Sequence, residues 1–266
     1  MCIRDRLKTN RDELNREAAR IIASAVRRDP SLTLGLATGS TTIGVYAELA
    51  RMHREEDLDF SKVVTFNLDE YVGLPANHPQ SFRFFMQQNL FRHINVNPTN
   101  IHIPDGMRRD NYDEYCAAYE DSIRQAGGID LQILGIGRNG HIGFNEPASS
   151  LGSRTRLKAL TRETLEDNRK FFASGEEMPK CAITVGIGTI LEARRIVLLA
   201  AGSSKSKAVA LAIEGPITAS VTASALQLHA DVTFIVNEEA AAELAQKDYY
   251  RRILELTAEF TPSRLW

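Results

Sequence analysis

The sequence predicts an α/β fold with a mainly parallel sheet and helices on both of its faces. Short apolar runs alternate with helical stretches almost throughout the chain, which is typical of right-handed βαβ units. Turns rich in glycine and hydroxyl residues follow several apolar runs, at the positions where such sheets bind ligands. The 43% of hydrophobic residues is enough to form a core. We therefore expect residues 1–266 to form a single Rossmann-like α/β domain.

The first half of the chain shows both periodicities clearly. Residues 9–28 carry apolar residues at helical spacing, which predicts an amphipathic helix. The expected strands in this half are 32–37, 63–68 and 129–134. Further helices are expected from the turn at 38–42 to about Met52, near 80–93 and over 110–126. The first six residues fit no structural pattern.

The second half continues the alternation after one polar interruption. Residues 150–178 are charge-rich and poor in hydrophobic residues, so we expect a mobile lid segment at about 150–180 that lies over a binding site. Strands are expected at 182–185, 196–201 and 232–236, with a helix that begins at 202–205. The C-terminal part is expected to be helical.

Composition narrows the classes of partner. The chain has 32 Lys and Arg against 34 Asp and Glu, a net charge of −2, which leaves no basic footprint for nucleic acid or an anionic membrane. No apolar run is long enough to span a bilayer. The three cysteines have no metal-ligand spacing and are interpreted as free thiols of a cytoplasmic protein. We expect neither a metal nor a cofactor.

The segment from Gly135 to Pro147 is the most informative stretch of the chain. It contains four glycines, His141 and Glu146, and it directly follows an apolar run. Glycines let the backbone approach a ligand closely, and histidine is the side chain that titrates nearest to neutral pH. Its glycines are not followed by a helix, as a dinucleotide-binding pattern requires. We therefore interpret this segment as a catalytic loop.

Three other turns follow expected strands. Residues 38–42 and 202–205 combine a glycine with hydroxyls at the start of a helix, which favours either a phosphate or an ordinary helix cap. Asp69 and Glu70 follow the strand 63–68 and offer a general base, a metal ligand or a solvated turn. Together these turns predict a small phosphorylated substrate with acid–base groups beside it.

Two long motifs resemble the glucosamine-6-phosphate deaminase family, also called glucosamine-6-phosphate isomerase. They are residues 64–74 (VTFNLDEYVGL) and 140–147 (GHIGFNEP), supported by 226–229 (LQLH), and the resemblance extends over about residues 10–255. It implies a cofactor-free isomerisation and deamination, a hydrolase reaction on an amino sugar phosphate that converts glucosamine 6-phosphate to fructose 6-phosphate and ammonia.

The resemblance also implies roles for individual residues. His141 matches the ring-opening histidine, Glu146 the carboxylate that orients it, and Asp69 the base that moves a proton between C2 and C1. Asn139 stands where many members have aspartate, so it can orient His141 but cannot stabilise an imidazolium by charge. We expect this difference to shift the pH dependence.

The phosphate site has four matching residues and one departure. The matching residues are Gly39, Ser40, Thr41 and Lys205. The family arginine that precedes two phenylalanines is replaced by Lys170, and Arg169 comes one residue earlier. Lysine lacks the bidentate fork of arginine. The resemblance leaves open which of these two side chains binds the phosphate.

A regulatory site is also implied. Ser149, Arg156 and Lys158 match residues of the allosteric, hexameric branch, in which N-acetylglucosamine 6-phosphate activates by binding between subunits. That site also uses the amino terminus, which does not match in this chain. We therefore expect a homo-oligomer, a hexamer by resemblance, with this sugar phosphate as its activator.

Two other functions stay open. 6-Phosphogluconolactonase shares the fold and a Gly-His pair, but the continuations at 144–147 and 69–74 favour the deaminase. A non-catalytic sugar-phosphate sensor would need a partner-binding or DNA-binding module, and the sequence shows neither a basic patch nor a helix-turn-helix extension.

Overall fold

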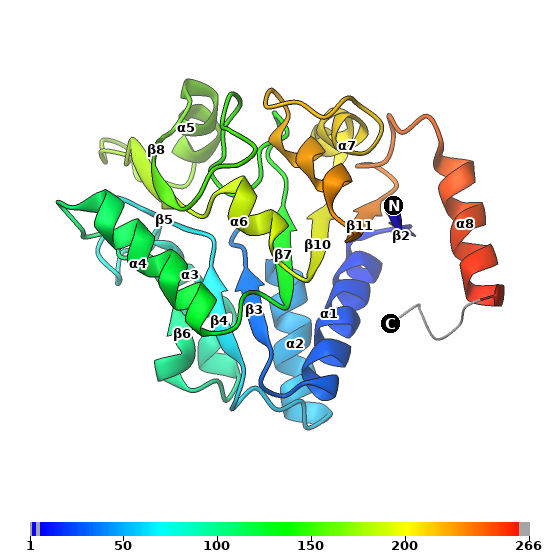
Figure 1. Cartoon of the computed structure of the whole chain (residues 1–266), viewed down its shortest axis with the longest axis horizontal. Helices are drawn as coiled ribbons and strands as arrows, with labels where there is room; N and C mark the ends of the chain where they lie inside the picture. The colour runs from blue at the N-terminus through cyan, green and yellow to red at the C-terminus, as the bar shows by residue number, and fades with distance from the viewer. Residues whose placement is uncertain (1, 4–5, 261–266) are drawn as a thin grey trace.

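The computed structural model describes residues 2–3 and 6–260 and contains a central parallel sheet with helices on both faces (Figure 1). All seven strand pairings of this eight-stranded sheet are parallel, because helical crossovers return the chain to the same end each time. The spatial order is β1 (Cys2–Ile3), β11 (Asp231–Asn237), β10 (Arg195–Ala200), β7 (Leu131–Gly135), β3 (Thr33–Leu36), β4 (Val64–Asn67) and β6 (Ile101–His102), with β2 (Arg6–Lys8) also paired to β11. The expected α/β fold is confirmed, whereas the assignment of the chain to a single domain stays a prediction.

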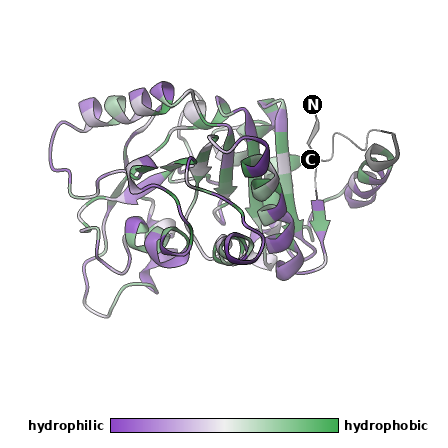
Figure 2. Cartoon of the chain, turned by 90° about the horizontal axis from the view of Figure 1, so that it is seen from below, coloured by the Kyte–Doolittle hydropathy of each residue, from purple (hydrophilic) through white to green (hydrophobic). Residues whose placement is uncertain are grey.

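The two faces of the sheet bury separate hydrophobic clusters. Helices α1 (Arg11–Arg28), α2 (Ile43–Glu55) and α3 (Phe82–Asn89) cover one face. Helices α4 (Tyr112–Gln125), α6 (Ile187–Leu191) and α7 (Ser206–Ile213) cover the other. In α1 the apolar stripe predicted from the sequence is buried, and the side chain of Asn10 caps the first turn. Figure 2 shows the hydrophobic residues gathered on the sheet and the inner helix faces.

The order of the strands reverses between β3 and β7. From β3 the chain moves outward through β4 to β6, and it then returns to β7 and continues through β10 to β11 on the opposite side. In open α/β sheets the two loops at such a reversal diverge and leave a crevice at the carboxyl ends of the strands. The loop after β3 and the glycine loop after β7 are therefore expected to line the crevice in which a ligand binds.

A second, antiparallel sheet corrects two expectations. Residues 69–71 are not a turn but strand β5 (Asp69–Tyr71), and the run expected at 182–185 is β9 (Cys181–Thr184), outside the main sheet. They pair with each other and with β8 (Arg156–Ala159). In Figure 1 this sheet lies above the arrowheads of β3 and β4. A short apolar run does not reveal which sheet it joins, so the sequence pattern could not separate β9 from the parallel strands.

The segment expected to be a mobile lid contains β8 and helix α5 (Arg162–Arg169). A third, smaller hydrophobic cluster lies beneath it, formed by Tyr71, Leu74, Phe144, Leu160, Phe172, Met178 and Ala182. The few apolar residues of this segment are thus used to attach it to β5 and to the glycine loop. Its mobility stays a prediction.

The first described residues and the last helix lie at the β11 edge of the main sheet. The first residues, for which no structure was expected, supply β1 and β2. Arg6 and Lys8 form ion pairs with the buried Glu17 of α1. Helix α8 (Lys247–Phe260) lies outside the two helical layers, beside β2 (Figures 1 and 2). The described residues also form the 3-10 helices η1 (Phe91–His93), η2 (Pro98–Asn100), η3 (Ser203–Lys205) and η4 (Thr222–Leu228). Among the helices described, none is long and apolar enough to cross a membrane.

Glu120 of α4 joins three elements beneath the second sheet. Its Oε1 accepts hydrogen bonds from the Thr155 backbone N–H at 2.8 Å and from the Thr189 hydroxyl at 2.6 Å. Its Oε2 lies 2.6 Å from Nη2 of Arg154. Burial alone would raise the pKa of Glu120, but these hydrogen bonds and the Arg154 charge lower it below its usual value.

We predict that Glu120→Ala lowers the free energy of unfolding by about 3 kcal/mol, because it leaves the donors of Thr155 and Thr189 without their acceptor and leaves Arg154 paired with Glu192 alone. A carboxylate with a lowered pKa contributes stability above its unfolded pKa and loses it as the pH falls. The deficit measured by urea denaturation should therefore shrink between about pH 5 and pH 3. The control is the exposed Glu177→Ala, expected within about 0.5 kcal/mol of the unmodified chain. Equal stability of the two variants at pH 7 would contradict this role of Glu120.

Candidate active site

The glycine loop after β7 folds back on itself around His141. The Gly137 N–H donates to the carbonyl of His141 at 2.8 Å, and the Gly140 N–H donates to the carbonyl of Gly137 at 3.0 Å. Gly140 has φ +84°, a left-handed conformation that favours glycine. A Cβ on Gly137 would lie 2.3 Å from Cε1 of His141. The loop therefore needs glycine at 137 so that the imidazole can lie across the backbone.

Two side chains hold one nitrogen of the His141 ring. Nδ1 lies 2.7 Å from Oδ1 of Asn139 and 3.4 Å from Oε2 of Glu146. Nδ2 of Asn139 also lies 3.4 Å from Oε2 of Glu146, which orients the amide with its oxygen toward the ring. Both neighbours of Nδ1 are acceptors, so we assign the proton to Nδ1. This leaves Nε2 available to exchange a proton with a substrate.

Glu146 divides its carboxylate between the imidazole and the lid segment. While Oε2 faces His141, Oε1 accepts a hydrogen bond from the backbone N–H of Thr161, the residue that caps α5, at 3.3 Å. Burial of this side chain, which is 1% exposed, would raise its pKa. Hydrogen bonds from His141, Thr164 and Thr161 outweigh burial and lower the pKa of Glu146 to about 2. Glu146 is therefore an anion at any pH near neutrality.

Asp69 lies beside Gly143 of the same loop. In β5 it is paired in register with Thr184 of β9, whose hydroxyl accepts from the Phe144 N–H at 3.0 Å. A Cβ on Gly143 would lie 3.5 Å from Oδ2 of Asp69, so the loop backbone passes directly over this carboxyl group. Burial, together with the charge of Glu70, raises the pKa of Asp69 to about 8. A carboxyl group with this pKa can exchange protons near neutral pH.

Glu70, the second carboxylate of the pair, has a structural role. Its Oε1 accepts from the backbone N–H groups of Tyr71 and Phe82, and its Oε2 accepts from that of Arg83, each at 2.9 Å. Phe82 and Arg83 are the first two residues of α3, so Glu70 caps this helix. Of the two carboxylates that the sequence places together, only Asp69 is directed at the glycine loop.

The loop after β3 exposes polar groups at the start of α2. Gly39 and Ser40 are exposed and Thr41 is half-buried, while the Thr42 hydroxyl donates back to the carbonyl of Gly39 at 3.0 Å. Gly39 has φ +127°, and a Cβ there would meet no atom within 4 Å. The glycine is therefore required by the turn itself. The free N–H groups of the first turn of α2 suit an anion.

Cations from three elements converge near the glycine loop. Arg138, beside Asn139, forms ion pairs with Asp167 of α5 at 2.9 Å and with Glu163 at 3.6 Å. Burial lowers the pKa of Lys205, and the charges of Asp167, Arg138 and Lys170 also act on its ammonium group. The charge of Lys170 therefore acts on Lys205 in the same direction as burial.

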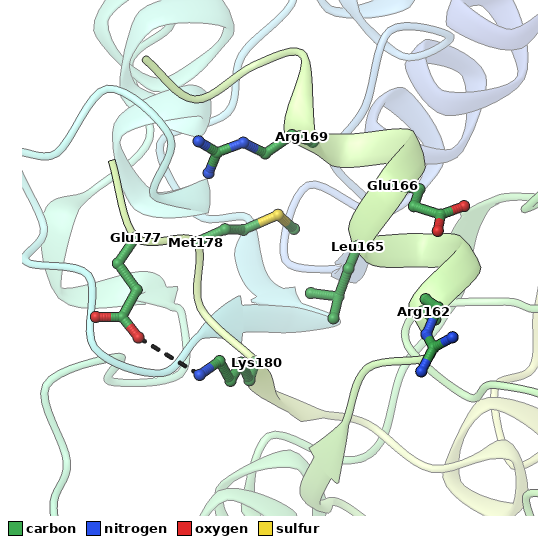
Figure 3. Close-up of a pocket in the computed structure, with 7 residues that line it drawn as sticks. All are labelled: Arg162, Leu165, Glu166, Arg169, Glu177, Met178 and Lys180. Atoms are coloured by element: carbon green, nitrogen blue, oxygen red, sulfur yellow. Dashed lines mark ion pairs between the residues drawn. The ribbon is translucent and has the colours of Figure 1, made fainter. Parts of the chain in front are cut away.

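Arg169, by contrast, bonds to the carbonyl of Glu176 at 2.5 Å. It also lines a pocket of about 550 Å³ between α5 and residues 177–180, which none of the predicted catalytic residues line (Figure 3). Arg169 is thus held by its own segment, whereas the charge of Lys170 acts on Lys205. Helical geometry explains the difference, because adjacent residues point about 100° apart.

Comparisons with known proteins identify the family of the chain. Residues 8–235 match the family described as glucosamine-6-phosphate isomerases/6-phosphogluconolactonase. The chain is 58% identical over 222 residues, 84% of each sequence, to a protein of Hahella chejuensis named glucosamine-6-phosphate deaminase. The chain belongs to this isomerase/lactonase family.

Solved structures separate the two branches of the isomerase/lactonase family. A monomeric glucosamine-6-phosphate deaminase superposes with a TM-score of 0.88 at 44% identity, covering 90% of this chain and 99% of its own. The 6-phosphogluconolactonase of Trypanosoma brucei superposes with a TM-score of 0.71 at 19% identity, covering 92% and 99%. At that low identity the second likeness shows only that the fold is shared.

Two of the three residues expected at a regulatory site, Arg156 and Ser149, contact the glycine loop. Arg156 donates from Nη1 to Oδ1 of Asn145 at 2.9 Å, and it shares one face of β8 with Lys158. The Ser149 N–H donates to the carbonyl of Glu146 at 3.0 Å, while the buried Ser149 hydroxyl has no hydrogen-bond partner among the described residues. A ligand at this place would therefore lie within a few residues of Glu146.

Sequence reasoning did not identify several residues of the site. Asn145 is fully buried and joins the loop to β9 through the Val185 carbonyl at 2.8 Å. Thr184 acts across a strand pairing that the sequence did not reveal. Glu70 was identified as a candidate carboxylate, but its role in capping α3 was not. The signal for Asn145 was present in the 140–147 motif, where it stands between two residues that were assigned. Within the described part of the chain, no group of three or more His, Cys, Asp or Glu side chains could hold a metal ion.

We predict that Gly137→Ala displaces the His141 ring and lowers the free energy of unfolding by about 2 kcal/mol, because the new methyl group overlaps the imidazole. The matched control is Gly135→Ala at the end of β7, where a Cβ meets nothing within 4 Å. Urea denaturation gives the free energy, and the C–H proton signals of His141 in NMR spectra report the ring. Unchanged His141 signals in Gly137→Ala would contradict this account of the loop.

Proposed function

We propose that this chain is a glucosamine-6-phosphate deaminase that converts glucosamine 6-phosphate and water to fructose 6-phosphate and ammonia. The observation that carries the proposal is that Asp69 and the His141–Glu146 pair adjoin the same glycine loop. Closely similar relatives are named for this activity. The isomerisation and deamination define the enzyme, and its description as a hydrolase rests only on the water it consumes.

The proposed reaction begins at the histidine. Nε2 of His141 accepts the proton of the anomeric hydroxyl and passes it to the ring oxygen of the sugar, which breaks the C1–O5 bond and gives the open-chain aldehyde. Glu146 and Asn139 keep Nδ1 as the donor side of the ring, so Nε2 can both give and accept a proton. Glu146 also supplies the negative charge that stabilises an imidazolium, which the neutral Asn139 cannot do.

Asp69 is proposed to carry the isomerisation. Its ionised carboxylate removes the proton at C2 and returns it at C1, so that the aldehyde passes through an enolamine to an imine at C2. Water adds to this imine, the C2–N bond breaks and ammonia leaves. The adjacent ammonium group of the substrate favours the carboxylate form of Asp69 when the substrate binds. Hydrolysis of a lactone does not move the proton at C2. A buried base at Asp69 therefore favours the deaminase over the lactonase.

The phosphate of the substrate is proposed to bind where the first turn of α2 and the cations meet. Gly39, Ser40 and Thr41 supply N–H and hydroxyl groups, and Lys205 supplies a positive charge. Lys170 takes the place of the family arginine. Arg169 is left out of this proposal because the carbonyl of Glu176 holds it.

The first test is ammonia release from glucosamine 6-phosphate, measured together with the fructose 6-phosphate formed. We expect equal amounts of both products, and turnover reduced about a thousandfold in Asp69→Asn with substrate binding retained. A folded protein that releases no ammonia would exclude the deaminase. Proton release from 6-phosphogluconolactone would then identify the lactonase, and binding without turnover the sensor.

The pH dependence follows from the environment of Asp69. Because burial raises the pKa of Asp69 to about 8 in the free protein, its carboxyl is mostly protonated at pH 7 and ionises as the pH rises. We expect kcat/KM to rise through about pH 8, and kcat at saturating substrate to rise at a lower pH. Carbon-13 NMR of the carboxyl group, assigned with Asp69→Asn, gives the pKa directly. Titration of Asp69 near pH 4 would contradict this prediction.

We further propose regulation at Ser149, Arg156 and Lys158 by N-acetylglucosamine 6-phosphate, in a homo-oligomer. Its support is the resemblance, the shared face of Arg156 and Lys158, and the contact of Ser149 with Glu146. One solved relative is monomeric, so the hexamer is not general in the family. A cytoplasmic location likewise stays a prediction from the sequence.

We expect added N-acetylglucosamine 6-phosphate to shift the substrate saturation curve of the unmodified chain to lower concentration. The variant Lys158→Gln is expected to lose this shift and to keep its activity at saturating substrate. Sedimentation velocity measures the oligomeric state in the same solutions. Hyperbolic kinetics that do not respond to the acetylated sugar would remove the regulatory proposal and leave the deaminase untouched.

A further inference from the structure

Arg138 is a charged residue of the catalytic loop to which neither the sequence motifs nor the proposed reaction assign a role. It lies between Gly137 and Asn139, so its backbone is fixed by the same turn that places His141. Its side chain is half-exposed and reaches across to α5 rather than into solvent alone. There Nη2 lies 2.9 Å from Oδ1 of Asp167 and 3.6 Å from Oε1 of Glu163.

The two faces of α5 have different surroundings. Arg162, Leu165, Glu166 and Arg169 share the face that lines the pocket in Figure 3. Glu163, Asp167 and Lys170 lie at the same spacing on another face, and this face meets Arg138. The charges of Asp167, Arg138 and Lys170 all act on Lys205. The ion pairs of Arg138 therefore join the loop that carries His141 to the segment that carries Lys170.

Charge and geometry together point to a ligand. The positive charges of Arg138 and Lys170 both act on Lys205, and Arg138 is balanced by two negative charges, Glu163 and Asp167. Ion pairs between partly exposed side chains are weak, so these carboxylates can be exchanged for a stronger anion. A phosphate dianion offers the paired oxygens that a guanidinium fork binds best. Lys170 lacks such a fork, and Arg169 is engaged elsewhere.

We propose that Arg138 binds the phosphate group of the substrate, and that Asp167 and Glu163 hold its guanidinium in the empty enzyme and release it when the phosphate arrives. This inference rests on the proposed function for the identity of the sugar. It supplies from the catalytic loop the bidentate contact that the family places at position 170. Phosphate binding then breaks the ion pairs that join the catalytic loop to this face of α5.

The test measures the dissociation constant for inorganic phosphate by calorimetry, so that it does not depend on turnover. Arg138→Gln should raise this constant by roughly tenfold, and Arg138→Lys, which keeps the charge but not the fork, by several-fold. Asp167→Asn should lower it by several-fold, because Arg138 is no longer held. The matched control is Arg162→Gln on the other face of α5, expected to leave it unchanged.

A double variant separates this exchange from general electrostatics. In the Arg138→Gln background, Asp167→Asn should lose most of its gain, because there is no guanidinium left to release. Full retention of that gain would overturn the proposal, as would unchanged binding in Arg138→Gln. If Arg138 only fastened α5, Arg138→Gln and Asp167→Asn would both weaken binding in parallel, which would also overturn it.

Two further outcomes keep the inference and the proposed function apart. If Arg138→Gln fails to fold, Arg138→Lys and Asp167→Asn still give opposite directions when the proposal is right. If the unmodified chain releases no ammonia but the phosphate constants shift as expected, Arg138 is a phosphate ligand and the deaminase proposal fails alone. With the deaminase active, Arg138→Gln should raise KM roughly tenfold and change kcat little.

Discussion

The carboxylate of Glu146 is the interaction on which the rest of the site depends. One oxygen faces the His141 imidazole and the other accepts from the first N–H of the α5 segment, so one buried anion orients the catalytic ring and anchors the segment above it. Its charge is maintained by hydrogen bonds that overcome the cost of burial. A shift of either neighbour must change the hydrogen bonds available to the other, because the carboxylate is rigid and planar.

The two acidic residues at the start of β5 show how environment assigns roles to similar groups. Glu70 accepts three backbone hydrogen bonds at the start of α3, while burial leaves the neighbouring Asp69 with a raised pKa. The charge of Glu70 adds to that effect. The carboxylate that fixes the helix therefore also tunes the carboxyl group that faces the loop. In the second sheet, the pairing of β5 with β9 holds these two residues beside the glycine loop.

The sequence predicted those structural features that depend on a few neighbouring residues. The apolar stripe of α1, the longer strands of the main sheet and the glycine loop around His141 could be predicted, because periodicity and glycine chemistry act over a few residues. The short strands β1, β2 and β6 were not predicted. The three-residue strand β5 could not be predicted either, since so short a strand shows no period. The choice between Arg169 and Lys170 depends on a rotation of about 100° per residue in α5, which requires the helix position to be known. The ion pairs of Arg138 join segments about thirty residues apart, beyond the reach of any motif.

The hydrophobic attachment of the α5 segment has a thermodynamic consequence. Phe172 is buried against Tyr71, with ring centroids 6.0 Å apart, in the small cluster beneath this segment. Any displacement that exposes Phe172 must bring aromatic surface into contact with water, which adds a positive heat capacity to the displaced state. The free energy of such a displacement would then vary with temperature along a curve. A turnover step that included it would show a bent Arrhenius plot even though the chemical steps themselves have constant activation enthalpy.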